Sequence, residues 1–254
     1  MRIATAPGTW GVEPPASDPG VPRWERVLDE IAEAGFDGSE LGPLGYLPAP
    51  PTLGRALRER GLSMPAGFVM EPLSIAEETE RVARVAGETC SALSSVGAEI
   101  LILIDGLSPE RSATAGRASD ARRLSVRGWD QLIATCDAVA AIAAESGLRV
   151  AFHPHAGTNV EFRDEIDRLM DDLDALNVGL CLDTGHAIYA GIDPVALIAA
   201  HHRRLLHVHL KDVDAAVLAA AVRDGGSFEQ AVSAGVFTPL GEGSVDLEAV
   251  AEAL

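Results

Sequence analysis

A chain of 254 residues with 47% apolar residues is long enough for one large α/β domain with a buried core. The net charge of −18 argues against nucleic-acid binding, which needs basic patches, and against binding to anionic membranes. No apolar run reaches the roughly 18 residues of a membrane span. The N-terminus lacks a signal-peptide pattern, so we expect a cytoplasmic protein.

Short apolar runs alternate with helical patterns along the chain. The runs expected to be strands are 3–7, 36–41, 62–70, 99–105, 148–153, 178–183 and 205–210. Helices are expected over 24–34, 52–60, 74–96, 126–146, 161–173 and from Pro194 onward, with further helical pieces after 213. This alternation predicts a parallel α/β fold. The polar segment 108–125 is expected to be a flexible loop over the top of the sheet, with a lid as one interpretation.

The strand count narrows the expected fold to an incomplete barrel. A closed (β/α)₈ TIM barrel needs eight strands, and seven are found here. We therefore expect a single TIM-barrel domain over residues 1–254 that lacks its eighth strand within this chain.

Five of the seven histidines lie in three motifs, and each motif follows an apolar run. The motifs are His153-Pro154-His155, Asp183-Thr184-Gly185-His186 and His207-Val208-His209-Leu210-Lys211-Asp212. The C-terminal ends of barrel strands meet at one face, so we expect His153, Asp183 and His209 to converge on one metal ion. Two imidazoles and a carboxylate favour Mn²⁺, Co²⁺, Zn²⁺ or Fe²⁺ over Ca²⁺ and Mg²⁺.

Four further residues, Glu40, His155, His186 and Lys211, are candidates for proton transfer. Lys211 is the only lysine of the chain, and lysine can change its protonation state where arginine cannot. Alternation along the second strand sends Glu40 into the barrel, although an exposed loop carboxylate is the alternative. His186 is expected on a loop, as a substrate contact or proton shuttle. His207, deeper in the barrel, is expected to pack or to support the ligands.

These motifs, together with Gly191-Ile192-Asp193-Pro194, resemble the xylose-isomerase-like barrel superfamily of sugar isomerases and epimerases. Within it the chain is most similar to the inosose dehydratases, through residues 32–42, 153–158, 165–170, 235–238 and 241–243. The resemblance implies a divalent ion held by Glu, Asp, His and Glu from four strands. Asp183 and His209 match the middle pair. His153 stands where the first Glu usually lies, as in dehydratase-like members, and the last Glu would lie beyond Leu254.

The resemblance implies a lyase of inositol catabolism that dehydrates a cyclic keto-polyol such as 2-keto-myo-inositol through a metal-stabilised enediolate. Mn²⁺ or Co²⁺ is favoured, with Zn²⁺ as an alternative. Which candidate residue is base and which is acid stays open. A ketose isomerase or 3-epimerase on the same ion is one alternative function, and a non-catalytic sugar-binding or partner subunit is another. The expected partner is a small polyol or keto-sugar, and the oligomeric state, a homo-oligomer included, stays open.

Overall fold

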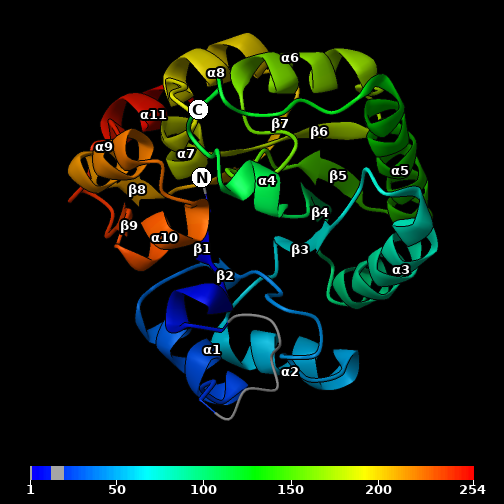
Figure 1. The fold of residues 1–254 in the computed structure, drawn as a ribbon. Coiled ribbons are helices and arrows are strands. Elements are labelled where there is room, and N and C mark those ends of the chain that lie inside the picture. Colours follow the sequence, from blue (N-terminus) through cyan, green and yellow to red (C-terminus); the bar gives the residue numbers. More distant parts are fainter. Residues whose placement is uncertain (1, 13–19) are drawn as a thin grey trace. The chain divides into compact units, whose positions relative to one another are not determined.

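The computed structural model describes residues 2–12 and 20–254. Strands and helices alternate along the chain, as expected (Figure 1). The seven expected strands are all present: β1 (Ala4–Thr5), β2 (Gly38–Ser39), β3 (Ala66–Glu71), β4 (Ile100–Asp105), β5 (Arg149–Phe152), β6 (Val178–Asp183) and β7 (Leu205–His209). Two short strands that the sequence does not predict follow them, β8 (Asp212–Val213) and β9 (Phe237–Thr238).

The helices agree with the expected ranges to within a few residues. They are α1 (Trp24–Glu33), α2 (Pro50–Arg60), α3 (Thr79–Ser95), α5 (Val126–Glu145), α6 (Arg163–Asp172), α8 (Pro194–His201), α9 (Ala215–Asp224), α10 (Phe228–Ser233) and α11 (Leu247–Ala253). Two short helices are unexpected, α4 (Pro109–Ser112) and α7 (Thr184–Tyr189). The helix expected from residue 74 begins later, because Ala76–Glu78 forms a separate 3₁₀ helix before α3.

The strand order is that of a barrel in which successive strands are neighbours. Five strands form one sheet in the order β3-β4-β5-β6-β7, and β1 pairs in parallel with β2. β6 and β7 are parallel, and Asp183 lies opposite His209 in their register. β8 and β9 form an antiparallel pair. The α/β class and the parallel pairing are confirmed, whereas the lack of an eighth barrel strand within this chain stays a prediction.

The chain divides into two compact units. The first comprises Met1–Val69, Ala83–Ile102 and Val139–Val150, and the second comprises Met70–Val82, Leu103–Ala138 and Ala151–Leu254. The second unit contains β6, β7, the β8–β9 pair and all seven histidines. It therefore holds every candidate site residue except Glu40.

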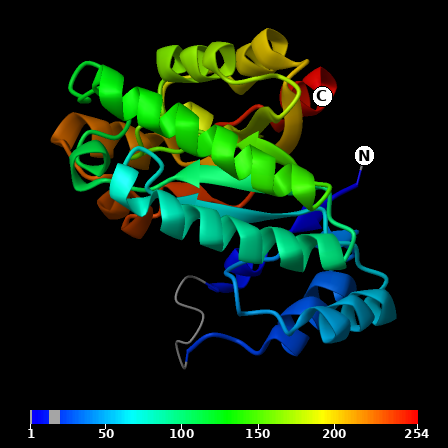
Figure 2. The ribbon, with the colours of Figure 1, turned by 90° about the vertical axis from the view of Figure 1, so that its right-hand side faces the viewer.

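Two apolar layers support the second unit. β6 is buried along its whole length, as expected for a strand that is covered on both faces. α8 packs against β6, and α11 packs against α8 (Figures 1 and 2). A separate apolar cluster packs beneath the β8–β9 pair and consists of Ala115, Ala156, Tyr189, Val213, Phe228, Ala231 and Val236.

Across residues 2–12 and 20–254, no helix has the length and apolar character that a membrane crossing requires.

The segment 108–125 is held by a buried ion pair, so the expectation of a flexible loop is wrong for its first part. Arg111 is 2% exposed and donates hydrogen bonds to both carboxylate oxygens of Glu165, at 2.8 and 3.0 Å. Glu165 also accepts the backbone N–H groups of Glu161 and Phe162 at the start of α6. The buried bidentate pair ties α4 to α6.

Breaking this pair should destabilise the protein strongly. Glu165→Ala removes the bidentate partner of the buried Arg111 guanidinium and leaves Glu161, 3.6 Å away, as its remaining carboxylate, so we expect a loss of about 3–5 kcal/mol in the free energy of unfolding, measured in urea. The matched control is Glu88→Ala, which removes an exposed pair with Arg84 in α3. The control should lose less than about 1 kcal/mol. Equal losses in the two variants would contradict the assigned role of the buried pair.

Candidate functional site

Asp183, the last residue of β6, uses its two carboxylate oxygens in different ways. Oδ1 accepts the backbone N–H of His186 at 2.9 Å and so caps α7. Oδ2 is buried, and among the described residues it forms no hydrogen bond. Its charged neighbour is Lys211, whose Nζ lies 3.2 Å away without hydrogen-bond geometry, and a bound cation would supply the partner that this oxygen lacks. The residues around Oδ2 therefore fit a metal ion.

His153 is placed and oriented as a metal ligand would be. It follows β5 directly, is 2% exposed and holds Nε2 at 3.6 Å from Asp183 Oδ2. Its Nδ1 lies 2.7 Å from the Pro154 carbonyl oxygen, which can only accept, so the ring hydrogen is on Nδ1. Nε2 is thus left with its lone pair, and a backbone carbonyl fixes the tautomer, as is common for metal-binding histidines.

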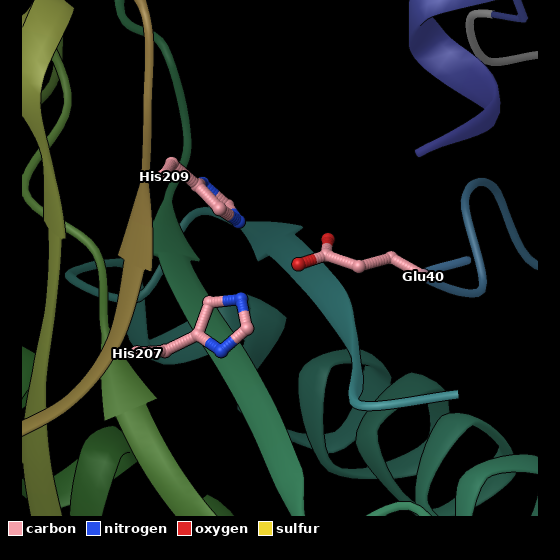
Figure 3. Close-up of side chains that lie close together, drawn as sticks. All are labelled: Glu40, His207 and His209. Atoms are coloured by element: carbon pink, nitrogen blue, oxygen red, sulfur yellow. The ribbon is translucent and has the colours of Figure 1, made fainter. Parts of the chain in front are cut away.

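His209 reaches the same carboxylate from β7. Its Nδ1 lies 3.8 Å from Asp183 Oδ2, as the register of β6 and β7 requires. His207 lies two residues earlier, and both side chains point to the same side of the strand (Figure 3). The two rings meet edge to face with centroids 5.2 Å apart. Alternation along β7 thus places His207 beside a candidate ligand, as the sequence predicts.

His186 and His155 form a close pair of tilted rings beside Asp183. Their ring centroids are 3.7 Å apart, and His186 is 3% exposed. His186 lies on α7, so the expected loop position is wrong. Ligand atoms of His153, Asp183 and His186 lie within 4.8 Å of one another, which makes these three a candidate metal group. A role for His186 as a ligand is not predicted from the sequence, although the motif 183–186 brings it within one helical turn of Asp183.

The ring nitrogens of His186 are both engaged within the protein. Nδ1 accepts the backbone N–H of Ala156 at 3.3 Å, so the neutral ring carries its hydrogen on Nε2. Nε2 lies 3.1 Å from Nζ of Lys211. His155 donates from Nδ1 to the Ala156 carbonyl oxygen at 2.8 Å. The loop after β5 therefore sets the tautomers of both rings.

Lys211 is held at the same place by its backbone and by its side chain. Its N–H donates to Thr184 Oγ1, which in turn donates to the Lys211 carbonyl oxygen, at 2.9 and 2.6 Å. Nζ lies 3.2 Å from Asp183 Oδ2. The side chain is thus placed between the carboxylate of Asp183 and the ring of His186.

The charges of the site match the needs of a metal ion. Burial raises the pKa of Asp183, but the combined effect of Lys211, His186 and His153 lowers it by more. The pKa of Asp183 is therefore well below the ordinary value. Burial lowers the pKa of His153, and it lowers that of His155 to about 3. Burial also lowers the pKa of His186 well below its usual range. An anionic carboxylate among neutral imidazoles is the state in which such groups bind metals.

Glu161 is a buried residue of this region that the sequence does not single out. Its carboxylate accepts the backbone N–H of Gly157 at 3.0 Å and that of Gly116 at 2.6 Å. Through these two hydrogen bonds, Glu161 links the loop that carries His155 to the segment 108–125. Glu161 also lines a small cavity together with Asp183 and His186. In the sequence Glu161 looks like an ordinary exposed residue at the start of a helix. Its burial depends on segments that are distant in the sequence, so no local pattern reveals it.

Glu40 is the candidate residue whose role stays a prediction. It directly follows β2, and its backbone N–H donates to the Thr5 carbonyl oxygen at 2.8 Å. Glu40, also labelled in Figure 3, belongs to the first unit, whereas the other candidates belong to the second. The second unit by itself brings together His153, Asp183 and His209 with His155, His186 and Lys211.

Comparison with known proteins identifies relatives over most of the chain. Residues 28–254 match the family described as xylose isomerase-like TIM barrel. An inosose dehydratase of Bacillus velezensis is 33% identical over 89% of this chain and 75% of its own length. An inosose dehydratase of Geobacillus thermodenitrificans is 32% identical over 100% of this chain and 85% of its own length.

Solved structures share the fold at low sequence identity. A crystal structure of the IOLI protein with a zinc atom aligns with a TM-score of 0.74 at 13% identity, covering 100% of this chain and 84% of that chain. A probable 3-DHS dehydratase from Bacillus anthracis aligns with the same TM-score at 15% identity, over 100% of this chain and 88% of that chain. The expected TIM-barrel fold is confirmed by these similarities.

Glu161 should make stability depend on pH. Burial raises its pKa from 4.5 to about 7, so the folded protein keeps a proton that the unfolded chain releases between these values. The resulting stabilisation is complete below pH 4.5 and is lost as the pH rises through 7, by roughly 3 kcal/mol. Glu161→Gln cannot ionise. We therefore expect the variant to lose less stability than the wild type between pH 4.5 and 8 in urea unfolding. Parallel pH profiles would show that Glu161 stays ionised in the folded protein.

Proposed function

This chain belongs to the xylose isomerase-like TIM barrel family, and on that premise we propose that it is a divalent-metal-dependent lyase that dehydrates a cyclic keto-polyol. The substrate class follows from its inosose dehydratase relatives, so 2-keto-myo-inositol is the compound to test first. The observation that carries the metal dependence is the buried Asp183 Oδ2, which lies near two histidine nitrogens and Nζ of Lys211 and, among the described residues, forms no hydrogen bond.

The proposed ligands are His153, Asp183 and His209, with Mn²⁺ or Co²⁺ favoured and Zn²⁺ as the alternative. His186 is the other candidate for the third position. We favour His209 because both ring nitrogens of His186 already face Ala156 and Lys211. A ligand that must first give up two hydrogen-bond contacts binds a metal ion less well. His207, beside His209, would support that ligand.

The bound ion would stabilise negative charge on the substrate's ketone oxygen while the neighbouring C–H bond breaks. Lys211 is the proposed base, because its Nζ lies at the proposed metal site, 3.2 Å from Asp183 Oδ2 and 3.1 Å from His186 Nε2. The proton taken from carbon then leaves with the β-hydroxyl as water, and a C=C bond forms. His155 and His186 stay neutral and orient Lys211 and the substrate, with Glu40 as a further candidate.

Ketose isomerisation or 3-epimerisation is the second candidate reaction, because it begins with the same proton abstraction. If Lys211 returns the proton to carbon, the β-hydroxyl stays and the product keeps the mass of the substrate. A non-catalytic sugar-binding or partner subunit is the third candidate.

A turnover experiment separates the three functions. The purified protein is incubated with Mn²⁺ or Co²⁺ and either 2-keto-myo-inositol or a panel of ketoses, and the products are identified by mass and NMR. We expect the keto-inositol to lose one molecule of water. Isomers of unchanged mass from a ketose, without dehydration, would establish the second function. Binding of sugar without turnover would establish the third.

The charge of Asp183 should decide metal binding. Asp183→Asn keeps an N-cap for α7 but removes the negative charge at Oδ2, so we expect at least about a 100-fold loss of Mn²⁺ affinity in calorimetry and loss of turnover. Asp193→Asn is the matched control, because Asp193 caps α8 in the same way by accepting the N–H of Val195. The control should bind Mn²⁺ like the wild type. Unchanged affinity in Asp183→Asn would refute the proposed ligand set.

A further inference from the structure

The amine of Lys211 has a third neighbour, an aromatic ring that the proposed mechanism does not use. Nζ lies over the ring of Phe237, 5.2 Å from its centroid. An ammonium or amine N–H above a ring face is attracted by the negative charge of that face. Lysine has four rotatable side-chain bonds, and ordering such a chain costs conformational entropy. A base that must meet one carbon atom therefore needs neighbours that restrict it.

Phe237 reaches this place through the β8–β9 pair. Phe237 lies opposite Val213 in the antiparallel register, and Val213 follows Lys211 by only two residues. Its ring meets the ring of His186 edge to face at 5.3 Å. The same ring is half-buried and packs against the apolar cluster beneath the pair. Phe237 therefore has one side in the core and another at the candidate site.

One buried carboxylate, that of Asp212, links the β8–β9 pair to the following loop through hydrogen bonds. Asp212, 1% exposed, accepts backbone N–H groups of four residues: Val213, Gly241, Gly243 and Val245. These hydrogen bonds hold β8, which follows Lys211 directly, in a fixed position relative to the loop after β9. A ring mounted on this support can restrict a flexible side chain.

Gly185 leaves the space in which Lys211 and Phe237 meet. A Cβ at this position would lie 2.6 Å from Cβ of Lys211 and 3.0 Å from Cε1 of Phe237. Both separations are shorter than normal contacts between carbon atoms. Lys211 and Phe237 thus approach the backbone of Gly185 so closely that only glycine fits at this position of the motif 183–186.

We propose that Phe237 is a positioning residue that holds the Lys211 amine beside Asp183 and His186, in a socket completed by Gly185. The catalytic consequence rests on the proposed function, whereas the placement of Lys211 does not. Phe237 stabilises the side chain in the orientation in which Nζ faces the metal site. Loss of the ring frees the side chain to turn toward solvent, since it is already 39% exposed.

Because Lys211 is the only lysine, NMR can observe its side chain alone. Protein grown with ¹³C-labelled lysine gives a single Cε–Hε signal, and protons above an aromatic ring resonate upfield. We expect the wild-type Hε signal upfield of free lysine, a shift toward free lysine in Phe237→Leu, and recovery in Phe237→Tyr, which keeps the ring. Phe228→Leu is the matched control. It removes a ring that also packs against His186, at 5.7 Å between centroids, but keeps the Phe237 ring above Lys211, so it should leave the upfield shift of Lys211 in place.

Kinetics then test the consequence for catalysis. We expect Phe237→Leu to lower kcat about tenfold with a smaller effect on KM, and Phe237→Tyr to restore it. A wild-type Hε signal at the free-lysine position, or the same signal in Phe237→Leu, would overturn the placement. A lost shift with unchanged kcat would overturn the positioning role. If the wild type dehydrates no keto-polyol, the proposed function fails, and the Hε signal still decides whether Phe237 holds Lys211.

Discussion

The carboxylate of Asp183 is the constraint on which the candidate site depends. One oxygen starts α7 by capping the N–H of His186, and the other stays buried among nitrogen atoms of His153, His209 and Lys211. Because the cap fixes where α7 begins, it also fixes Gly185 and His186 relative to the strand. A single side chain thus joins the end of β6 to the elements that would surround the proposed metal ion.

Buried carboxylates hold the loops around this centre, which explains how an acidic chain can bury several of them. Each one accepts backbone N–H groups from segments that are distant in the sequence. Asp105 binds Leu73 and Asn159, Glu161 binds Gly116 and Gly157, and Asp212 binds Gly241, Gly243 and Val245. Hydrogen bonds of this kind offset the desolvation of a charged group. The loops that carry the candidate residues are therefore rigid without long apolar segments.

The two proposed reactions, dehydration and epimerisation, share the first proton abstraction and then differ: in dehydration the proton leaves with the β-hydroxyl as water and a C=C bond forms, whereas in epimerisation the proton returns to carbon. Both begin at a carbon beside a polarised ketone, and both need an amine held within reach of that carbon. Lys211 contacts His186, Asp183 and Phe237, and in the proposed mechanism these contacts would restrict its amine. The outcome of that mechanism would then depend on whether a β-hydroxyl of the substrate lies within reach of Nζ.

The sequence by itself determined the strands and the residues at their ends, because an apolar run that stops at His153, Asp183 or His209 is a local signal. Parallel pairing then brings these ends to one edge. Only the tertiary structure decided the tautomers of His153 and His186, the burial of Glu161 and the contact of Phe237 with Lys211. α7 and the β8–β9 pair are too short to show periodicity, and their geometry comes from a side-chain cap and from hydrogen bonds to Asp212. Such contacts join residues far apart in the chain, so no local pattern encodes them.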